Sequence, residues 1–400
     1  MTDTIFDSAI VGGGPAGCGA AITLAGLGAR VVLLEAKKYP HDKLCGEFLS
    51  PECATMLEGL SLAKRLRALG PATIQIARLT APDGAVWETR LPDIAWGLTR
   101  LALDAAMAEH ASLAGVVVRP ATTVTSVGGS LEGGFELAIR SAASTPVRSP
   151  PRIHARTVIA AHGKRAALDR ALGRHFLDRP QPFMALKAHF HGPPIPGRVE
   201  LHGFNGGYCG MSEIEGGAAN VCLLVHESVF RSAAPAGADR LAAFLSWMAR
   251  QNPRLHDWLS QAKPVDAGWL SIGQVPFRSK RPVEDDVLMA GDAAGLIAPL
   301  AGDGIAMALR SGGLAAARCG DFLAGRLSAA GLRRGYAADW GREFSARLRL
   351  GRALQSIMLR PRLLAPALRL VTAWPQVGRF LIARTRDMPH ETRPLTAALE

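Results

Sequence analysis

The feature that most constrains the fold lies near the start of the chain, where a glycine pattern stands between two apolar runs. A short apolar run precedes Gly12, Gly14 and Gly17, an alanine-rich segment follows, and a second apolar run, 31–34, ends at Glu35. The order strand, glycine turn, helix, strand and terminal glutamate is typical of a Rossmann-type dinucleotide site. The sequence therefore predicts an α/β protein.

Each part of this motif has a physical role. Gly12 permits the tight turn, Gly14 lets backbone amides approach a pyrophosphate, and Gly17 lets the helix pack on the strand. Glu35 can accept hydrogen bonds from a ribose and disfavours a 2′-phosphate, so FAD or NAD is expected here. The candidate pyrophosphate-binding residues are Gly12, Gly14, Pro15, Ala16 and Gly17.

A second glycine-rich motif lies at residues 287–313. An apolar run meets Gly291-Asp292, and after Pro299 the pair Gly302 and Gly304 opens a helix. An aspartate at a strand end can bind a polyol, and a helix N-terminus can stabilise negative charge on a ligand. Two such motifs in one chain suit a long ligand such as FAD.

Together the two motifs resemble those of FAD-dependent oxidoreductases with the glutathione-reductase-like fold. The likeness is to the flavoprotein monooxygenase and geranylgeranyl-reductase-like group, and it spans roughly residues 5–320. The resemblance implies that Asp292 contacts the ribityl chain and that Arg100, in "GLTRLALDAAM", contacts the cofactor. It places Pro299, Gly302 and Gly304 at the isoalloxazine ring. It also implies NADH or NADPH as the electron donor.

The stretch "KLCGEFLSPE" at 43–52 has a similar Cys-Gly in geranylgeranyl-reductase-like proteins, beside the isoalloxazine. Gly46 fits a close backbone approach to the ring, and Lys43 can favour the thiolate of Cys45. Cys45 is therefore the candidate catalytic residue. The alternative is a role in packing or cofactor positioning.

The same resemblance predicts a discontinuous Rossmann-like FAD-binding domain with an inserted antiparallel-sheet substrate domain and a C-terminal helical tail. We assign residues 1–70, 95–175 and 276–330 to the FAD-binding domain, 71–94 and 176–275 to the substrate domain, and 331–400 to the tail.

Within the substrate domain, the glycine-rich stretch 203–212 makes Phe204 and Tyr208 the candidate pocket residues. The alternative for this stretch is a glycine-permitted strand bend. His162 replaces an aspartate that aromatic hydroxylases of the group carry, and it is interpreted as a loop histidine. No histidine shows metal-site spacing, so no metal is expected.

The tail is basic and amphipathic. Phe344, Leu348, Gly351, Leu354 and Met358 fall on one helical stripe, and prolines at 361, 366 and 375 predict short helices after it. Such helices could cap the protein's own core, cap a substrate cavity or contact a membrane surface.

Composition limits the remaining classes. The six cysteines form no C-x-x-C pair and the N-terminus is acidic, which predicts reduced thiols and a cytoplasmic location, with membrane association left open. The net charge of +12 is concentrated in the arginine-rich tail, but aromatic residues are not interleaved there as in single-strand nucleic-acid sites, so no nucleic acid is expected.

Three functions fit the resemblance. The first is NAD(P)H-driven monooxygenation of a lipophilic aromatic or polyketide-like compound, and the close alternative is double-bond reduction of an isoprenoid chain. The third is a non-catalytic prenyl-binding protein, which the two intact nucleotide motifs disfavour.

Overall fold

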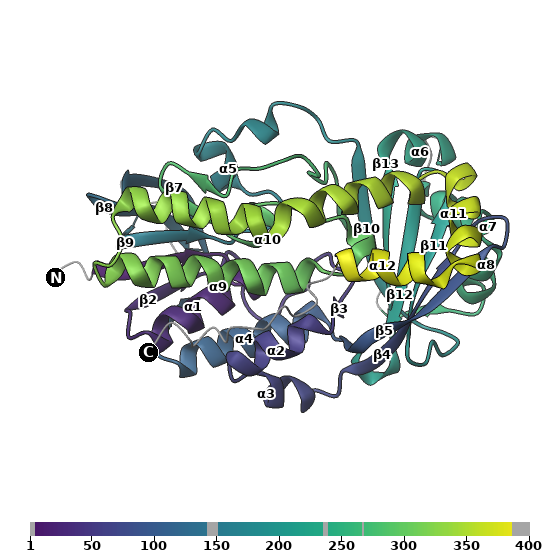
Figure 1. Cartoon of the computed structure of the whole chain (residues 1–400), viewed down its shortest axis with the longest axis horizontal. Coiled ribbons are helices and arrows are strands. Elements are labelled where there is room, and N and C mark those ends of the chain that lie inside the picture. The colour runs from purple at the N-terminus through teal and green to yellow at the C-terminus, as the bar shows by residue number, and fades with distance from the viewer. Residues whose placement is uncertain (1–4, 142–150, 235–238, 266–267, 386–400) are drawn as a thin grey trace.

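The computed structural model describes residues 5–141, 151–234, 239–265 and 268–385, and it arranges them around two β-sheets (Figure 1). In the first sheet, five strands run parallel in the order β17, β9, β1, β2, β6. Their bounds are Val287–Met289, Arg152–Ala160, Ile5–Val11, Val31–Leu34 and Val117–Arg119. The edge strand β16 (Val283–Glu284) and the hairpin β7 (Thr122–Ser130) and β8 (Gly134–Ser141) add antiparallel pairs. This sheet confirms the expected Rossmann-like unit.

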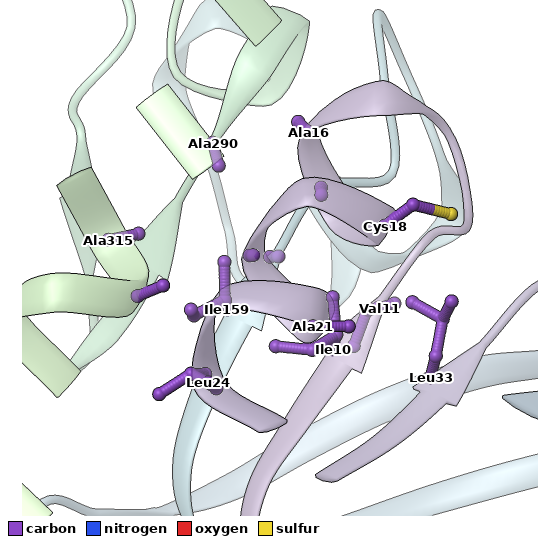
Figure 2. Close-up of a cluster of buried hydrophobic side chains, with 14 of the residues drawn as sticks. Ile10, Val11, Ala16, Cys18, Ala21, Leu24, Leu33, Ile159, Ala290 and Ala315 are labelled. Carbon is purple, nitrogen blue, oxygen red and sulfur yellow. The ribbon is translucent and has the colours of Figure 1, made fainter. Parts of the chain in front are cut away.

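Helices α1 (Pro15–Gly26) and α9 (Gly304–Leu323) pack against each other beside this sheet. Figure 2 shows Ile10 of β1, Leu24 of α1 and Ala315 of α9 within one buried cluster. Small residues allow the close contact, because a Cβ atom at Gly312 would lie 2.2 Å from the carbonyl oxygen of Ala16. Helices α2 (Glu52–Gly59), α3 (Ala63–Arg67) and α4 (Arg100–Leu113) pack beside α1 and α9, and α5 (Ala167–Ala171) packs against β7.

The second sheet runs in the order β14, β10, β13, β12, β11, β4, β5, β3, and β15 also pairs with β10. All its pairs are antiparallel except β4 with β11. The strands are Lys263–Pro264, Phe183–His191, Ala219–His226, Gly207–Glu213, Arg198–Phe204, Ala72–Thr80, Val86–Gly97, Phe48–Leu49 and, for β15, Leu270–Ile272. The inserted antiparallel sheet is therefore present, with β3 contributed from the segment that we assigned to the FAD domain.

Alternate residues of this second sheet face two different layers, as the two-residue period of a strand requires. Cys209 and Leu223 pack toward α6 (Glu227–Ala233), α7 (Arg240–Arg250) and α8 (Pro253–Leu259). Tyr208 and Leu224 face the opposite way, toward residues of the C-terminal helices. One face of the second sheet therefore belongs to a hydrophobic core with α6, α7 and α8, and the other face packs with the C-terminal helices.

The C-terminal part forms α10 (Ala329–Met358), α11 (Pro361–Ala373) and α12 (Pro375–Thr385). The predicted stripe on α10 is confirmed in part, because Phe344, Gly351 and Met358 are buried. Pro361 and Pro375 begin helices as expected, but Pro366 lies inside α11. A proline inside a helix removes one backbone hydrogen bond, and the burial of Leu364, Ala365 and Leu368 on the same helix offsets that loss. Residues 386–400 of the assigned tail lie outside the described residues.

The contact between α1 and α9 can be tested with Gly312→Ala. An alanine normally favours a helix by about 1 kcal/mol over glycine, but the clash with the Ala16 carbonyl should reverse the sign and lower the free energy of unfolding by about 1–3 kcal/mol. Chemical denaturation measures it. Gly26→Ala, at an exposed helix position with no atom near the new Cβ, is the matched control and should be neutral or stabilising. Equal effects of the two substitutions would contradict the packing argument.

Candidate functional site

The turn between β1 and α1 is built for a phosphate. Gly12 has φ +106°, and a Cβ there would lie 2.4 Å from the carbonyl oxygen of Ala161. A Cβ at Gly17 would lie 1.8 Å from the Gly12 carbonyl oxygen, so only glycine lets the helix begin this close to the strand. The N-terminus of α1, at Gly14 and Pro15, therefore opens into a cavity with its free amides and the positive end of its dipole.

Glu35 follows β2 and is held rigidly beside this turn. Its Oε2 accepts a hydrogen bond from the Gly13 amide at 2.8 Å, and its Oε1 accepts one from the Lys37 amide at 3.1 Å. The ammonium of Lys43 lies 3.3 Å from Oε2. The carboxylate is buried in the protein yet lines the cavity, which is the position required of a ribose acceptor.

Two cations, each paired with a carboxylate, lie beside the turn. The guanidinium of Arg100, the first residue of α4, binds Asp104 through Nε at 2.8 Å and Nη2 at 2.7 Å. Burial alone would lower the pKa of Arg100, but the Asp104 carboxylate outweighs it and raises that pKa. A Cβ on Gly14 would be 3.1 Å from Arg100 Nη2 and 3.8 Å from Lys43 Nζ, so both cations adjoin the α1 N-terminus. Asp104 was not anticipated, although its four-residue spacing from Arg100 is a usable signal.

The second motif forms the other end of the site. Gly291 has φ +61° and begins a short 3₁₀ turn, where the Asp292 carboxylate lies 3.4 Å from Lys164 Nζ. The buried ammonium of Lys280 donates to the backbone carbonyls of Asp292 at 2.7 Å and of Lys164 at 2.8 Å. Burial lowers the pKa of Lys280 to about 8. A second 3₁₀ turn, Pro299–Ala301, leads to Gly302 in the left-handed region and then to α9.

These parts surround one cavity of about 830 Å³. Nearly all of the residues expected from sequence line it: Gly12, Gly14, Pro15, Ala16, Glu35, Lys43, Cys45, Gly46, Arg100, Tyr208, Gly291, Asp292, Pro299, Gly302 and Gly304. Gly17 lies just beneath, under the turn. Motifs almost three hundred residues apart in sequence therefore form one continuous site.

One expected pocket residue needs correction. Phe204 is fully buried on the other face of the second sheet, where its ring packs against Phe244 and Trp247, and it does not line the cavity. Across the tight turn Phe204 pairs with Gly207 and Tyr208 pairs with Gly203, so the two rings lie on opposite faces. The Tyr208 hydroxyl donates to Gln355 at 3.3 Å and accepts from the Leu300 amide at 3.2 Å.

Cys45 and Gly46 also line the cavity. The Cys45 sulfur accepts a hydrogen bond from the Glu47 amide at 3.4 Å, and its carbonyl accepts one from Asn220 Nδ2 at 3.1 Å. A Cβ on Gly46 would meet no atom within 4 Å, so open space adjoins that backbone. A second thiol, Cys222, also lines the cavity, and burial raises its pKa to about 12.

The loop that carries Cys45 is anchored by Glu47, which sequence reasoning did not select. Its buried carboxylate accepts from the Arg100 amide at 2.8 Å and from Lys187 Nζ at 2.6 Å through Oε1. Oε2 lies 2.7 Å from His189 Nε2. Lys187 and His189 project from the same face of β10, two residues apart, but nothing in the local sequence indicates their partner in a distant loop.

Asp42, Glu47 and His189 also lie close enough to hold a cation. Lys187 Nζ already lies 2.6 Å from both Asp42 Oδ1 and Glu47 Oε1, so its ammonium supplies the positive charge. Burial would lower the pKa of Lys187, but the carboxylate of Glu47, with that of Asp42, raises it.

His162 lies where the chain leaves β9 and lines the cavity. Its Nε2 lies 3.0 Å from Asp169 Oδ1, and Arg174 donates to the same oxygen at 2.9 Å. Burial alone would raise the pKa of Asp169, but the contacts with His162 and Arg174 outweigh it and lower that pKa to about 2. This arrangement holds the loop next to Gly12.

The glycine cradle at Gly12 and Gly17, the fixed Glu35 and the cations at the α1 N-terminus fit a dinucleotide, and Asp292 extends the site away from it. Together with the parallel sheet, they define an FAD-binding flavoprotein.

The comparisons with known proteins agree. Residues 6–333 match the FAD binding domain family, so this chain belongs to that family, and the protein is an FAD-dependent oxidoreductase.

Among curated relatives, menaquinone reductase of Mycolicibacterium smegmatis is 26% identical over 76% of this chain and 73% of its own length. Digeranylgeranylglycerophospholipid reductase 1 of Methanothermobacter thermautotrophicus is 30% identical over 75% of this chain and 73% of its own.

Solved structures give the same fold. A geranylgeranyl bacteriochlorophyll reductase-like protein from Thermoplasma acidophilum has a TM-score of 0.77 at 20% identity, covering 99% of this chain and 98% of its own. A myxobacterial chondrochloren halogenase has a TM-score of 0.75 at 21% identity, covering 98% and 95%. These two likenesses concern the fold alone.

The buried Glu47–Lys187 pair can be tested by a double-mutant cycle. Lys187→Met leaves the Glu47 carboxylate buried with only the Arg100 amide and His189 as partners, so we expect the free energy of unfolding to fall by about 3–5 kcal/mol. In Lys187→Met/Glu47→Gln that charge is gone, and the loss should be smaller than in the single variant. Denaturant titration of all four proteins measures the coupling, and strictly additive losses would contradict it.

Proposed function

We propose that this protein reduces carbon–carbon double bonds in an isoprenoid chain, with FAD as cofactor and NADH or NADPH as electron donor. The observation that carries the proposal is the shape and lining of the cavity. Beyond the flavin-site residues it continues between the second sheet and the C-terminal helices, among leucine, isoleucine, valine and methionine side chains. An extended apolar chain has the chemistry that such a lining binds.

The curated relatives support the same choice, because those described above are named as reductases of menaquinone and of a digeranylgeranylglycerophospholipid. The hydroxylation that the sequence favoured rests on the fold, and this fold also serves halogenation. Double-bond reduction, the alternative raised from sequence, is therefore preferred here.

FAD, when bound, takes a hydride equivalent from the nicotinamide and delivers it to the substrate. The chain supplies the surroundings. The N-terminus of α9 at Gly304 stabilises negative charge on a group bound beside it. Apolar residues such as Leu224 and Leu368 exclude water from the substrate end of the cavity.

Reduction of an alkene also needs a proton for the second carbon. Cys45 lines the cavity, and its backbone carbonyl accepts a hydrogen bond from Asn220 of the second sheet, so its thiol is the candidate group to deliver that proton. Cys222 lines the cavity as well, but its raised pKa of about 12 makes it a poor acid.

The function is tested by anaerobic reduction of the purified yellow protein with NADH and with NADPH, followed by a geranylgeranyl compound or by air. We expect reoxidation coupled to saturation of the chain, measured by mass spectrometry. Oxygenated product after air, with no saturation under anaerobic conditions, would instead establish hydroxylation.

A cavity variant makes this test sharper. Ala367→Phe places a ring in the cavity from α11, so kcat/KM for a geranylgeranyl substrate should fall by about tenfold or more while a dimethylallyl substrate is less affected. Ala373→Phe, exposed on the same helix, is the control and should change neither.

Cys45→Ser tests the proton donor. Serine can still accept from the Glu47 amide, so flavin content and the rate of flavin reduction should stay unchanged. If the thiol acts as the acid, product formation alone falls, because a hydroxyl is a weaker acid than a thiol. Unchanged turnover with full flavin content would leave Cys45 with a positioning role only.

A further inference from the structure

Helix α11 lines the substrate end of the cavity with one face. Leu364, Ala367, Leu368 and Val371 point into the cavity, at the spacing of a single helical stripe. From α12, Leu381 reaches the same cavity, and Gly378 lets α12 rest on Trp87, since a Cβ there would lie 2.5 Å from the indole. These two helices are therefore part of the cavity wall.

The outward side of the same helices is also apolar. Leu363 and Leu370 of α11 are 44% and 47% exposed, and Trp374, at the junction with α12, is 62% exposed. Val377 and Phe380 extend this exposed group along α12. Figure 1 shows α11 and α12 on the outside of the molecule, beside the second sheet. So many large apolar side chains gathered in one short segment mark an interaction surface.

The charged residues of this segment are all basic. Between residues 360 and 385 the chain has five arginines and no acidic residue, and the acidic neighbour Asp83 pairs with one of them. Arg360 and Arg362 are exposed. Arg369, the residue before Leu370, is exposed as well, and its Nη2 lies 2.6 Å from Oδ2 of Asp83 on the neighbouring turn. Leucine and tryptophan flanked by arginine are the composition of a helix that lies in a membrane interface.

We propose that the outward face of α11 and α12, defined by Leu363, Leu370, Trp374, Val377 and Phe380, docks on an anionic lipid surface. The docked helices are also the cavity wall, so a lipophilic substrate can pass from the bilayer into the cavity without crossing water. This delivery rests on the proposed isoprenoid specificity, whereas the docking itself does not.

The docking is peripheral. Among the described parts of the chain, none of the helices combines the length and apolar character of a membrane span. Binding must then come from the exposed apolar side chains together with attraction between arginines and anionic headgroups.

Vesicle flotation of the full-length holoprotein tests the proposal. Wild-type protein should bind vesicles of phosphatidylcholine with phosphatidylglycerol, bind vesicles of phosphatidylcholine alone far less, and be released by high salt. Arg362→Glu should weaken binding by about tenfold or more, because it reverses one charge at the surface. Leu370→Ser/Trp374→Ser should also abolish most binding.

Matched controls lie elsewhere on the surface. Leu113→Ser and Arg231→Glu change an exposed leucine and an exposed arginine on α4 and α6, and they should bind like wild type. Flavin absorbance and melting temperature, measured for every variant, show whether each is folded.

Two outcomes would overturn the proposal. One is binding by folded Leu370→Ser/Trp374→Ser and Arg362→Glu that equals wild type. The other is a wild-type dimer in light scattering that the double variant makes monomeric, with no vesicle binding by either, which would assign the surface to a second copy. Flotation involves no turnover, so docking can hold even if isoprenoid reduction fails, and the reverse.

Discussion

The buried carboxylate of Glu47 joins helix α4, beside the nucleotide-binding turn, to strand β10 of the second sheet. It receives the backbone amide that opens α4 on one side and Lys187 and His189 of β10 on the other. Glu47 has φ +54°, a conformation that costs a non-glycine residue about 1–3 kcal/mol and persists only where its surroundings hold it. In a low-dielectric interior, leaving any of these charges unpaired would cost more than the strain. The loop with Cys45 is thereby fixed against both the nucleotide half and the substrate half of the cavity.

On either side of this loop the residues have different roles: those of the nucleotide half concern the cofactor, and those of the substrate half concern the choice of substrate. The glycine turn, Glu35 and Asp292 would hold the cofactor whatever the reaction, so they say nothing about the acceptor. The lining beyond Cys45 differs in kind, because it is almost wholly apolar and enclosed by α10 and α11. Tyr208, Ser212 and Ser271 are the hydroxyl-bearing residues there, and the Tyr208 hydroxyl is already engaged by Gln355 and the Leu300 amide. A polar aromatic substrate would find few hydrogen-bond partners in this part of the cavity.

The nucleotide half could be predicted from sequence because its residues act through local backbone geometry. Gly12, Gly17 and Gly302 stand where a turn or a close approach excludes a side chain, so a glycine at these positions can be recognised from a single sequence. The substrate half could not be predicted equally well. Phe204 and Tyr208 lie four residues apart, yet strand alternation across a tight turn sends them to opposite faces. Glu47 and Lys187 are 140 residues apart in the sequence, and only the tertiary fold brings them together. No sequence periodicity indicates such a pair.

Helix α10 runs unbroken from Ala329 to Met358, about 45 Å at 1.5 Å per residue. Near its start Tyr336 is buried and bonds to the Met289 carbonyl of β17, while Leu354, Ile357 and Met358 near its end line the substrate cavity. The same helix therefore contacts both the nucleotide-binding core and the substrate end of the cavity. The part of the cavity wall that α10 forms is thus tied to the nucleotide-binding core, whereas the part that the shorter α11 and α12 form packs on the second sheet and on α10 itself.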